Sequence, residues 1–240
     1  MKKISGLAHR GYPGKAPENT LSSFQAACDL SYSHLELDVQ LSKDGVPVVF
    51  HDYKIDRMSD GKGWVKDYTL EQLKQFRIGE TETIPTLEET LQQLKGKIEF
   101  VIELKKAGEM YPTLEEATLD VIRHTDTLAQ SRIISFDHFA IAKMRRLDPD
   151  IELGLLTGSC LPYVFPYLKE IRCTFLGFLD IFLTPAYAEM MRANGVVIYS
   201  PGVVDSIEAM QLMTDKYPDA VITTNELERW ASMYLKRSEQ

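Results

Sequence analysis

The sequence has 240 residues, of which 44% are hydrophobic, and a formal net charge of −8. A chain of this length can bury a sizeable core and can form one barrel or one open-sheet domain. The negative charge argues against nonspecific binding to nucleic acid and against stable association with an anionic membrane. No apolar run approaches the ~18 residues of a membrane-spanning helix.

The cysteines and the first residues predict a cytoplasmic protein. Cys28, Cys160 and Cys173 are odd in number and widely spaced. This pattern fits buried thiols in a reducing compartment and fits neither a disulfide framework nor a zinc site. Two lysines follow the first methionine, but the apolar core of a signal peptide does not follow them.

Apolar residues recur first with the period of a strand and then with that of a helix. A strand is expected at residues 4–9, and a loop bearing glycine and proline follows at 11–17. The spacing of the next apolar residues predicts a helix near 20–30. The chain therefore opens with a strand–loop–helix unit.

Residues 35–52 predict a β-hairpin. Apolar and polar residues alternate strictly in its first half, so Glu36 and Asp38 share one face of a strand. Asp44-Gly45 is a strong hairpin turn signal. A two-residue turn would place Asp38 opposite His51, whereas a longer loop would shift this register. A hairpin at the edge of a sheet with a solvated acidic face is the alternative interpretation.

Residues 53–85 fit no simple strand–helix unit, and we interpret them as a small insertion. Thr86 and Glu89 have the spacing of a capping box, which predicts a helix that ends near residue 94. Strands are then expected at 98–105, 132–136, 151–156, 176–183, 196–200 and 220–223. Helices are expected between and after them, at 114–124, 138–147, 163–171, 186–193, 206–216 and the end of the chain.

Without the return strand of the hairpin, the chain has eight expected strands, and all but one lead directly into a helix. Such alternation predicts an α/β fold with a parallel sheet. Eight units predict a closed (β/α)8 TIM barrel, formed by residues 1–240 as one domain with a small insertion at 53–85, after the second strand and its hairpin. An open doubly wound sheet is the alternative. In a barrel, functional residues lie at the C-terminal ends of the strands.

Three carboxylates fall near such strand ends. Glu36 and Asp38 lie late in one strand, and Glu103 lies late in the next strand of the expected barrel. Carboxylates gathered in one pocket repel each other, and a hard divalent cation such as Mg²⁺ or Ca²⁺ would relieve the repulsion. We therefore predict one divalent metal ion; solvated charges at the rim are the alternative.

Two histidines and two cations stand beside these carboxylates. His9 and His51 each adjoin an apolar strand, and their place beside the acidic cluster favours acid–base chemistry over a purely structural role. Arg10 and Lys105 suit a phosphoryl group, which an arginine fork matches and a lysine charge attracts. Salt bridges to Glu18 or Glu103 are the alternative for the two cations.

Five segments of the chain occur in the order of a known family. They are HRGYPGKAPENT at 9–20, LELDVQLSKDGVPVVFHD at 35–52, IPTLEET at 84–90, IELK at 102–105 and SFD at 135–137. In these motifs the chain resembles the bacterial glycerophosphodiester phosphodiesterases. The resemblance implies a (β/α)8 barrel and hydrolysis of a glycerophosphodiester to sn-glycerol 3-phosphate and an alcohol.

The resemblance also implies roles for particular residues. Glu36, Asp38 and Glu103 would bind the cation, and His9 and His51 would form the acid–base pair.

Further residues would complete the substrate site. Arg10 and Lys105 would bind the phosphate, Glu18 and Asn19 would brace that site, and Asp52 would orient the neighbouring histidine.

The last third of the chain departs from the family pattern. A Trp-Thr-Val-Asn-like segment is usual there, but residues 199–202 read Tyr-Ser-Pro-Gly. The usual terminal Thr-Asp-x-Pro appears as Thr-Thr-Asn-Glu at 223–226. The family tryptophan commonly contacts the glycerol or alcohol, so we expect Tyr199 to form one wall of that part of the site. This departure bears on substrate identity more than on reaction type.

The expected partner is a small-molecule glycerophosphodiester, and the oligomeric state stays open, a homo-oligomer included. A barrel that binds such diesters without turnover is the rival hypothesis, although binding alone requires neither His9 nor His51. A Schiff-base aldolase that uses Lys105 is a third hypothesis, and the neighbouring carboxylates argue against it because they oppose a depressed lysine pKa.

Overall fold

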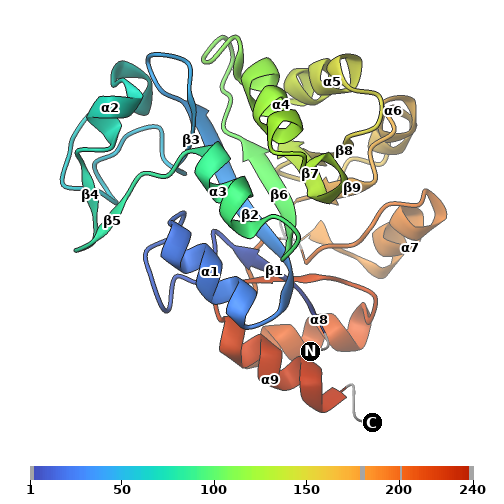
Figure 1. Cartoon of the computed structure of the whole chain (residues 1–240). Coiled ribbons are helices and arrows are strands. Elements are labelled where there is room, and N and C mark those ends of the chain that lie inside the picture. Colours follow the sequence, from blue (N-terminus) through green and yellow to red (C-terminus); the bar gives the residue numbers. More distant parts are fainter. Residues whose placement is uncertain (1–2, 179–181, 201, 238–240) are drawn as a thin grey trace.

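The computed structural model describes residues 3–178, 182–200 and 202–237. Its main sheet has parallel neighbours in the order β10-β1-β2-β6-β7-β8-β9, and the short strand β3 pairs antiparallel with β2 (Figure 1). The strands are β1 (Ile4–His9), β2 (Tyr32–Leu41), β3 (Pro47–Val49), β6 (Glu99–Leu104), β7 (Ser131–Ser135), β8 (Glu152–Leu156), β9 (Phe175–Gly177) and β10 (Ile222–Thr224).

Residues 196–200 close this sheet into a ring. Val197 forms a parallel bridge with Phe175, and Tyr199 forms another with Val221. The Ser200 amide donates to the Val221 carbonyl at 2.7 Å. The prediction of a closed (β/α)8 barrel is therefore confirmed and the open sheet is not, although the seventh strand of the barrel, at residues 196–200, makes only isolated bridges. The strand expected at 176–183 ends at residue 177, and its residues 179–181 lie outside the described chain.

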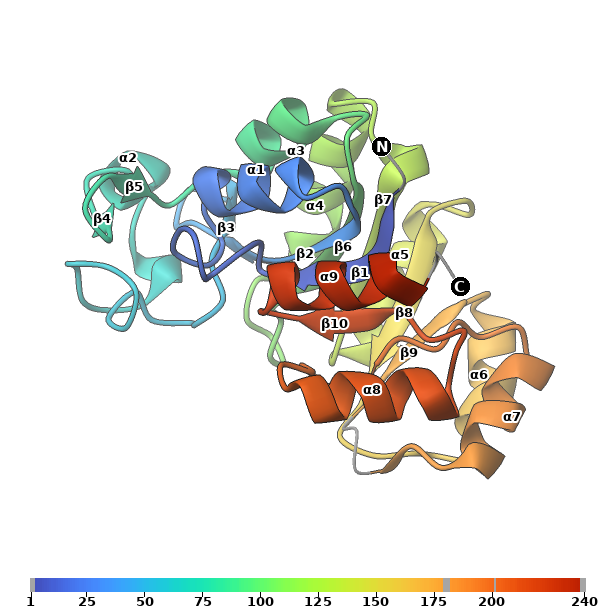
Figure 2. The same cartoon turned by 90° about the horizontal axis from the view of Figure 1, so that it is seen from below.

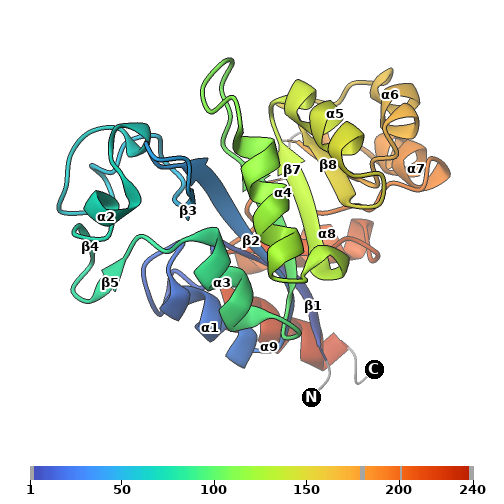
Figure 3. The same ribbon diagram turned by 45° about the horizontal axis from the view of Figure 1, so that its top comes forward.

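Helices cover the outside of the barrel. Figures 1 and 3 show α1, α3 and α4 along the half that carries β2 and β6, and Figure 2 shows α9 beside β1. The helices are α1 (Leu21–Asp29), α3 (Leu87–Leu94), α4 (Leu114–His124), α5 (His138–Leu147), α6 (Val164–Glu170), α7 (Pro185–Ala193), α8 (Ile207–Lys216) and α9 (Leu227–Arg237), with a 3-10 turn η2 at Leu128–Gln130. In the described part of the chain, no helix is long and apolar enough to cross a membrane.

The strand pattern explains where the core and the polar residues lie. Leu35, Leu37 and Val39 are fully buried and belong to the large core between the sheet and the helices. The intervening side chains Glu36 and Asp38 therefore face the inside of the barrel, because successive side chains alternate between faces. A separate small apolar cluster is formed by Leu7, Val101, Ile134, Phe175 and Tyr199.

The capping box predicted at Thr86 and Glu89 is confirmed. The Thr86 hydroxyl accepts from the Glu89 amide at 3.0 Å, and the Glu89 carboxylate accepts from the Thr86 amide at 2.8 Å. These two bonds satisfy backbone donors at the start of α3, which have no partner within the helix.

The predicted register of the hairpin is wrong by one residue. Val39 pairs with Val49, and the Phe50 amide donates to the Asp38 carbonyl at 2.9 Å, so Asp38 lies opposite Phe50 rather than His51. The loop has three residues because the Ser42 hydroxyl accepts from the Val46 amide at 2.9 Å and holds the longer turn.

Residues 53–85 form a small unit beside the barrel, at the left of Figure 1. They contain η1 (Val65–Asp67), α2 (Leu70–Leu73) and the antiparallel pair β4 (Arg77–Ile78) and β5 (Glu82–Thr83). Their apolar residues share a cluster with two hairpin residues: Val48, Phe50, Ile55, Val65, Leu73, Ile78 and Ile84. The insertion therefore packs directly on the segment that leads to His51.

Candidate active site

Three carboxylates meet inside the barrel at the C-terminal ends of β2 and β6. Asp38 and Glu103 are paired across the two strands, and Glu36 is two residues before Asp38. One oxygen from each of the three side chains lies within 4.8 Å of the other two. The structure thus brings together all three residues that the sequence pattern assigned to a metal.

The electrostatics of this cluster fit a cation. Burial raises the pKa of Glu36 well above its ordinary value, and the charges of Asp38 and Glu103 raise it further. Burial and the Asp38 charge also raise the pKa of Glu103. Asp38 Oδ1 is buried and has no hydrogen-bond partner. Oxygen donors of this kind suit Mg²⁺ or Ca²⁺, and a cation would relieve the repulsion.

Two cations lie against the carboxylates. Lys105 Nζ is 2.8 Å from Glu103 Oε1 and 3.6 Å from Asp38 Oδ1. Burial opposes the charged form of Lys105, but these two carboxylates outweigh it and raise its pKa. Arg10 Nε lies 3.4 Å from Asp38 Oδ2. A raised lysine pKa disfavours a Schiff-base role, which needs a neutral amine.

Arg10 lies in a strained turn that is held by hydrogen bonds to other residues of the site. Its φ is 58°, in the left-handed region that disfavours side chains, and Asn19 has a φ of 56°. The Arg10 amide donates to Glu36 Oε2 at 3.0 Å, and the Asn19 amide donates to the Arg10 carbonyl at 3.0 Å. Asn19 Nδ2 donates to Asp38 Oδ2 at 2.8 Å. Asn19 therefore couples the turn to the carboxylate cluster.

Glu18 joins two arginines at the edge of the site. It accepts from Arg10 Nη1 at 3.1 Å and from Arg57 Nη2 at 2.6 Å. Arg57 Nε also donates to Asp52 Oδ2 at 2.6 Å. Glu18 is thus placed to orient Arg10, and through Arg57 it is linked to the residue that follows His51.

His51 has one ring nitrogen fixed by Asp52. The Nδ1–Oδ1 distance is 2.6 Å, and the bond from Arg57 lowers the pKa of Asp52 to about 2. Asp52 is therefore ionised and accepts the proton on Nδ1, which leaves Nε2 for the cavity. Burial lowers the pKa of His51, so the ring is neutral at neutral pH.

His9 is fixed in the same way by Asn225, a residue that sequence reasoning did not assign to the site. His9 Nδ1 lies 3.0 Å from Asn225 Oδ1, and Asn225 Nδ2 donates to Asp205 Oδ2 at 3.1 Å. The carboxylate thus sets the orientation of the amide, so the amide oxygen faces His9 and accepts from Nδ1. Burial, followed by the charge of Arg10, lowers the pKa of His9.

Gln40 is a second residue that sequence reasoning did not assign, although it continues the alternation of Glu36 and Asp38. Its buried amide donates to the carbonyls of Phe50 and Asp52, at 2.7 Å each, and of His51 at 3.3 Å. The Tyr111 hydroxyl donates to Gln40 Oε1 at 2.9 Å. Gln40 thus supports the segment that follows β3 and carries His51.

We expect Gln40→Leu to lower kcat by up to ~100-fold, because a small displacement of a catalytic group can cost this much. Tyr111→Phe should have a smaller effect in the same direction, since it removes one bond and keeps the ring. Divalent-cation affinity, measured by calorimetry, should not change. A folded Gln40→Leu variant with the wild-type kcat would contradict this role.

Tyr199 lies at the inner end of the cavity. Its ring is 3% exposed and meets Phe175 edge-on at 4.5 Å between centroids. Its hydroxyl accepts a hydrogen bond from Arg132 Nη1. Arg132 lies at the beginning of β7, which is the end of the strand opposite to the carboxylates. The ring is therefore placed to contact a ligand in the cavity, whereas its hydroxyl is directed away from the carboxylates.

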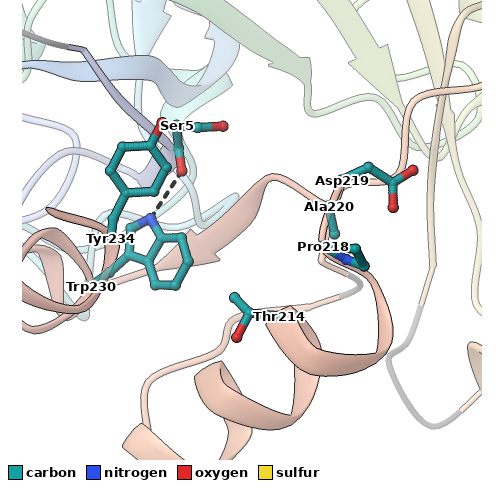
Figure 4. Close-up of a pocket in the computed structure, with 7 residues that line it drawn as sticks. All are labelled: Ser5, Thr214, Pro218, Asp219, Ala220, Trp230 and Tyr234. Carbon is teal, nitrogen blue, oxygen red and sulfur yellow. Dashed lines mark hydrogen bonds between the residues drawn. The ribbon is translucent and has the colours of Figure 1, made fainter. Parts of the chain in front are cut away.

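The catalytic candidates share one cavity of about 300 Å³. Its lining includes His9, Arg10, Glu36, His51, Glu103, Lys105 and Tyr199. A second hollow lies at the opposite ends of the strands (Figure 4), where Trp230 Nε1 donates to the Ser5 carbonyl at 2.9 Å. Asp219 in that hollow is already paired with Arg192 at 2.7 Å. The cavity at the C-terminal ends therefore carries the candidate chemistry.

The fold and this cavity define a TIM-barrel enzyme with an acidic centre, and comparisons with known proteins agree. Residues 9–225 match the model of the glycerophosphoryl diester phosphodiesterase family. A glycerophosphodiester phosphodiesterase from Caldanaerobacter subterraneus subsp. tengcongensis is 35% identical, over 90% of this chain and 92% of the length of that protein. A second glycerophosphodiester phosphodiesterase, from Bacillus altitudinis, is 39% identical, over 71% of this chain and 73% of the length of that protein.

A solved structure agrees as well. This structure is of an Oleispira antarctica phosphodiesterase in complex with the product sn-glycerol-3-phosphate. It superposes on this chain with a TM-score of 0.89 and 26% sequence identity, and the match covers 97% of this chain and 96% of that one. The chain therefore belongs to the glycerophosphoryl diester phosphodiesterase family, and the predicted family and enzyme class are confirmed.

Proposed function

We propose that this chain hydrolyses glycerophosphodiesters to sn-glycerol 3-phosphate and an alcohol, with one divalent cation, Mg²⁺ or Ca²⁺. The observation that carries the proposal is the group of three carboxylates, two of which, Glu36 and Glu103, line one cavity with two histidines, an arginine and a lysine. The product bound to the Oleispira antarctica enzyme supports the same product here. We further propose a cytoplasmic protein in which residues 1–240 form one domain.

Each charged group has a role in this proposal. Glu36, Asp38 and Glu103 hold the cation, and Arg10 and Lys105 bind the phosphate. The cation, when bound, supplies positive charge beside the phosphoryl oxygens. Arg10 and Lys105 supply further positive charge beside the carboxylates. The phosphate of the substrate would therefore lie next to this group of charges.

The histidines carry the proton transfers. Their Nδ1 atoms are held by Asp52 and Asn225, so each ring can exchange a proton through Nε2. One histidine, neutral and with a free Nε2, takes the proton from the attacking hydroxyl. The other must carry a second proton, on Nε2, when the diester binds, and it donates that proton to the departing alkoxide. This pairing distinguishes the enzyme from a barrel that only binds the diester.

We propose that the first nucleophile is the hydroxyl of the substrate glycerol next to the phosphate ester. Its attack forms one P–O bond, breaks the P–O bond to the alcohol and gives a cyclic glycerol phosphate. Water then opens the ring, with the histidines in exchanged roles. An attacking group within the substrate has a large effective-molarity advantage over water.

A diester that lacks this hydroxyl should therefore bind but react far more slowly. We expect the deoxy analogue of glycerophosphocholine to act as a competitive inhibitor, with its own turnover followed by phosphorus NMR. The native diester, measured in parallel with the same cation, provides the control. Comparable kcat values for both diesters would exclude this route and favour direct attack by water.

A further inference from the structure

One arginine of the insertion lies between two carboxylates that support the active site. Arg57 Nε donates to Asp52 Oδ2 at 2.6 Å, and Arg57 Nη2 donates to Asp52 Oδ1 at 3.1 Å. On the other side, Nη2 donates to Glu18 Oε1 at 2.6 Å and Nη1 donates to Glu18 Oε2 at 3.3 Å. Each carboxylate is therefore held at two points, which fixes its direction as well as its distance.

Each of these carboxylates holds a residue that lines the cavity. Asp52 accepts from His51 Nδ1 at 2.6 Å, and Glu18 accepts from Arg10 Nη1 at 3.1 Å. Among the described residues, the lining of the cavity includes His51 and Arg10 but neither Arg57 nor its two carboxylate partners. Arg57 thus lies behind the cavity, one carboxylate away from a proton-transfer group and one carboxylate away from a phosphate-binding group.

The charges along this series of contacts support one another. Burial opposes the ionised form of Glu18, but the bond from Arg57 and the charge of Arg10 outweigh it and lower the pKa of Glu18. The bond from Arg57 likewise lowers the pKa of Asp52, and the bonds to both carboxylates raise the pKa of Arg57. Near neutral pH, Arg57 is therefore a charged donor between two ionised acceptors.

The insertion holds the backbone on both sides of Arg57. Ile55 is fully buried in the apolar cluster of the insertion, and its amide donates to the Gly63 carbonyl at 2.9 Å. The Ser59 amide and hydroxyl both donate to the Ile55 carbonyl, at 3.0 and 2.8 Å. Met58 packs against the same cluster, and its sulfur accepts from Arg57 Nη1 at 3.0 Å. The Arg57 side chain thus extends from an anchored turn, although 47% of it is exposed.

We propose that Arg57 is a positioning residue that sets both the tautomer of His51 and the direction of the Arg10 side chain. The inference rests on the proposed function, in which these two residues transfer a proton and bind the phosphate. It also gives the insertion a task, because the insertion supplies the group that joins the two sides of the site. Arg57 does not line the cavity, so its loss acts through Asp52 and Glu18.

The first test is the loss of this side chain. Arg57→Ala should lower kcat by about 10- to 100-fold, because a small displacement of a catalytic group costs this much. KM for glycerophosphocholine should rise by up to about fivefold, the size of an exposed ion pair, and Tm should stay within about 4 °C of the wild type. Arg57→Lys should show most of the same loss, because an ammonium keeps the charge but lacks the planar fork.

Arg192→Ala is the matched control, because Arg192 also bridges two carboxylates. Its Nε and Nη2 donate to Asp219 at 2.8 and 2.7 Å, and its Nη1 donates to Glu189 at 2.9 Å. Asp219 lines the hollow at the opposite ends of the strands, so this network lies away from the cavity. The control should keep the wild-type kcat and KM. Wild-type kcat in both Arg57 variants, or an equal fall in the control, would contradict the inference.

Double substitutions separate the two sides of the site. In the Asp52→Ala background, Arg57→Ala should change kcat by less than about twofold and should still raise KM, because only the link to His51 is already broken. In the Glu18→Ala background, Arg57→Ala should still lower kcat and should no longer raise KM. A general loosening of the insertion would multiply with both substitutions, and that result would replace the positioning role by a structural one.

Nitrogen NMR of the free protein tests the inference without turnover, since ring nitrogens with and without a proton have distinct chemical shifts. At mildly alkaline pH, where the ring is neutral, His51 should carry its proton on Nδ1 in the wild type and in Arg192→Ala. In Arg57→Ala it should exchange between both tautomers. His9, which is held by Asn225, should not change and serves as the internal control.

The outcomes distinguish this inference from the proposed function. An unchanged His51 tautomer in Arg57→Ala, in an enzyme that hydrolyses glycerophosphocholine, would refute the positioning role and leave the proposed function intact. A changed tautomer in a protein that hydrolyses no glycerophosphodiester would support the positioning role and refute the proposed function.

Discussion

Removal of divalent cations by a chelator is expected to reduce hydrolysis of glycerophosphocholine to background, and added Mg²⁺ or Ca²⁺ is expected to restore it. The reason is the repulsion among three carboxylates in a buried cluster, which raises the pKa values of Glu36 and Glu103. Lys105 and Arg10 balance part of this charge, but Asp38 Oδ1 keeps no hydrogen-bond partner. A cation would satisfy this oxygen and complete the charge balance.

Substitutions should separate cation binding from folding. Asp38→Ala and Glu103→Ala should weaken cation binding in calorimetry and abolish turnover, and Asp38→Asn should lose the rise in Tm that a bound cation gives the wild type. Glu99→Ala is the matched control, because Glu99 is an exposed carboxylate at the other end of the same strand. Wild-type rates that do not respond to chelation would overturn the metal assignment.

His9→Ala and His51→Ala are each expected to lower kcat by ~10²–10⁴-fold, the usual size of an acid–base contribution. Each ring has Nδ1 engaged, by Asn225 and by Asp52, and each lines the cavity. Cation affinity should change little, since neither ring is assigned as a ligand. Stopped assays of product release, with calorimetry on the same samples, would measure both effects.

His124→Ala is the control for these variants, because His124 is 73% exposed at its side chain and lies at the end of α4. It should retain the wild-type kcat and cation affinity. If His51→Ala lost the cation instead of only slowing turnover, the assigned roles would be wrong.

Local sequence patterns determined much of the fold. Alternation along β2 predicted that Glu36 and Asp38 face one side, and the capping box at Thr86 and Glu89 predicted where α3 begins. Both features depend on residues a few positions apart, whose geometry follows from the period of a strand or of a helix turn. The count of strand–helix units predicted the barrel, and the barrel brings Glu103 to the same end as the carboxylates of β2.

The tertiary structure decided the features that depend on contacts between distant segments. The Ser42 hydroxyl accepts from the Val46 amide in a hairpin loop that is one residue longer than predicted, and Asp38 therefore lies opposite Phe50. Asn225 reaches His9 across 216 positions, and Tyr111 reaches Gln40 across 71, so no local period reports either contact. Periodicity specifies which face a side chain occupies, whereas its partners depend on how the strands are ordered and closed.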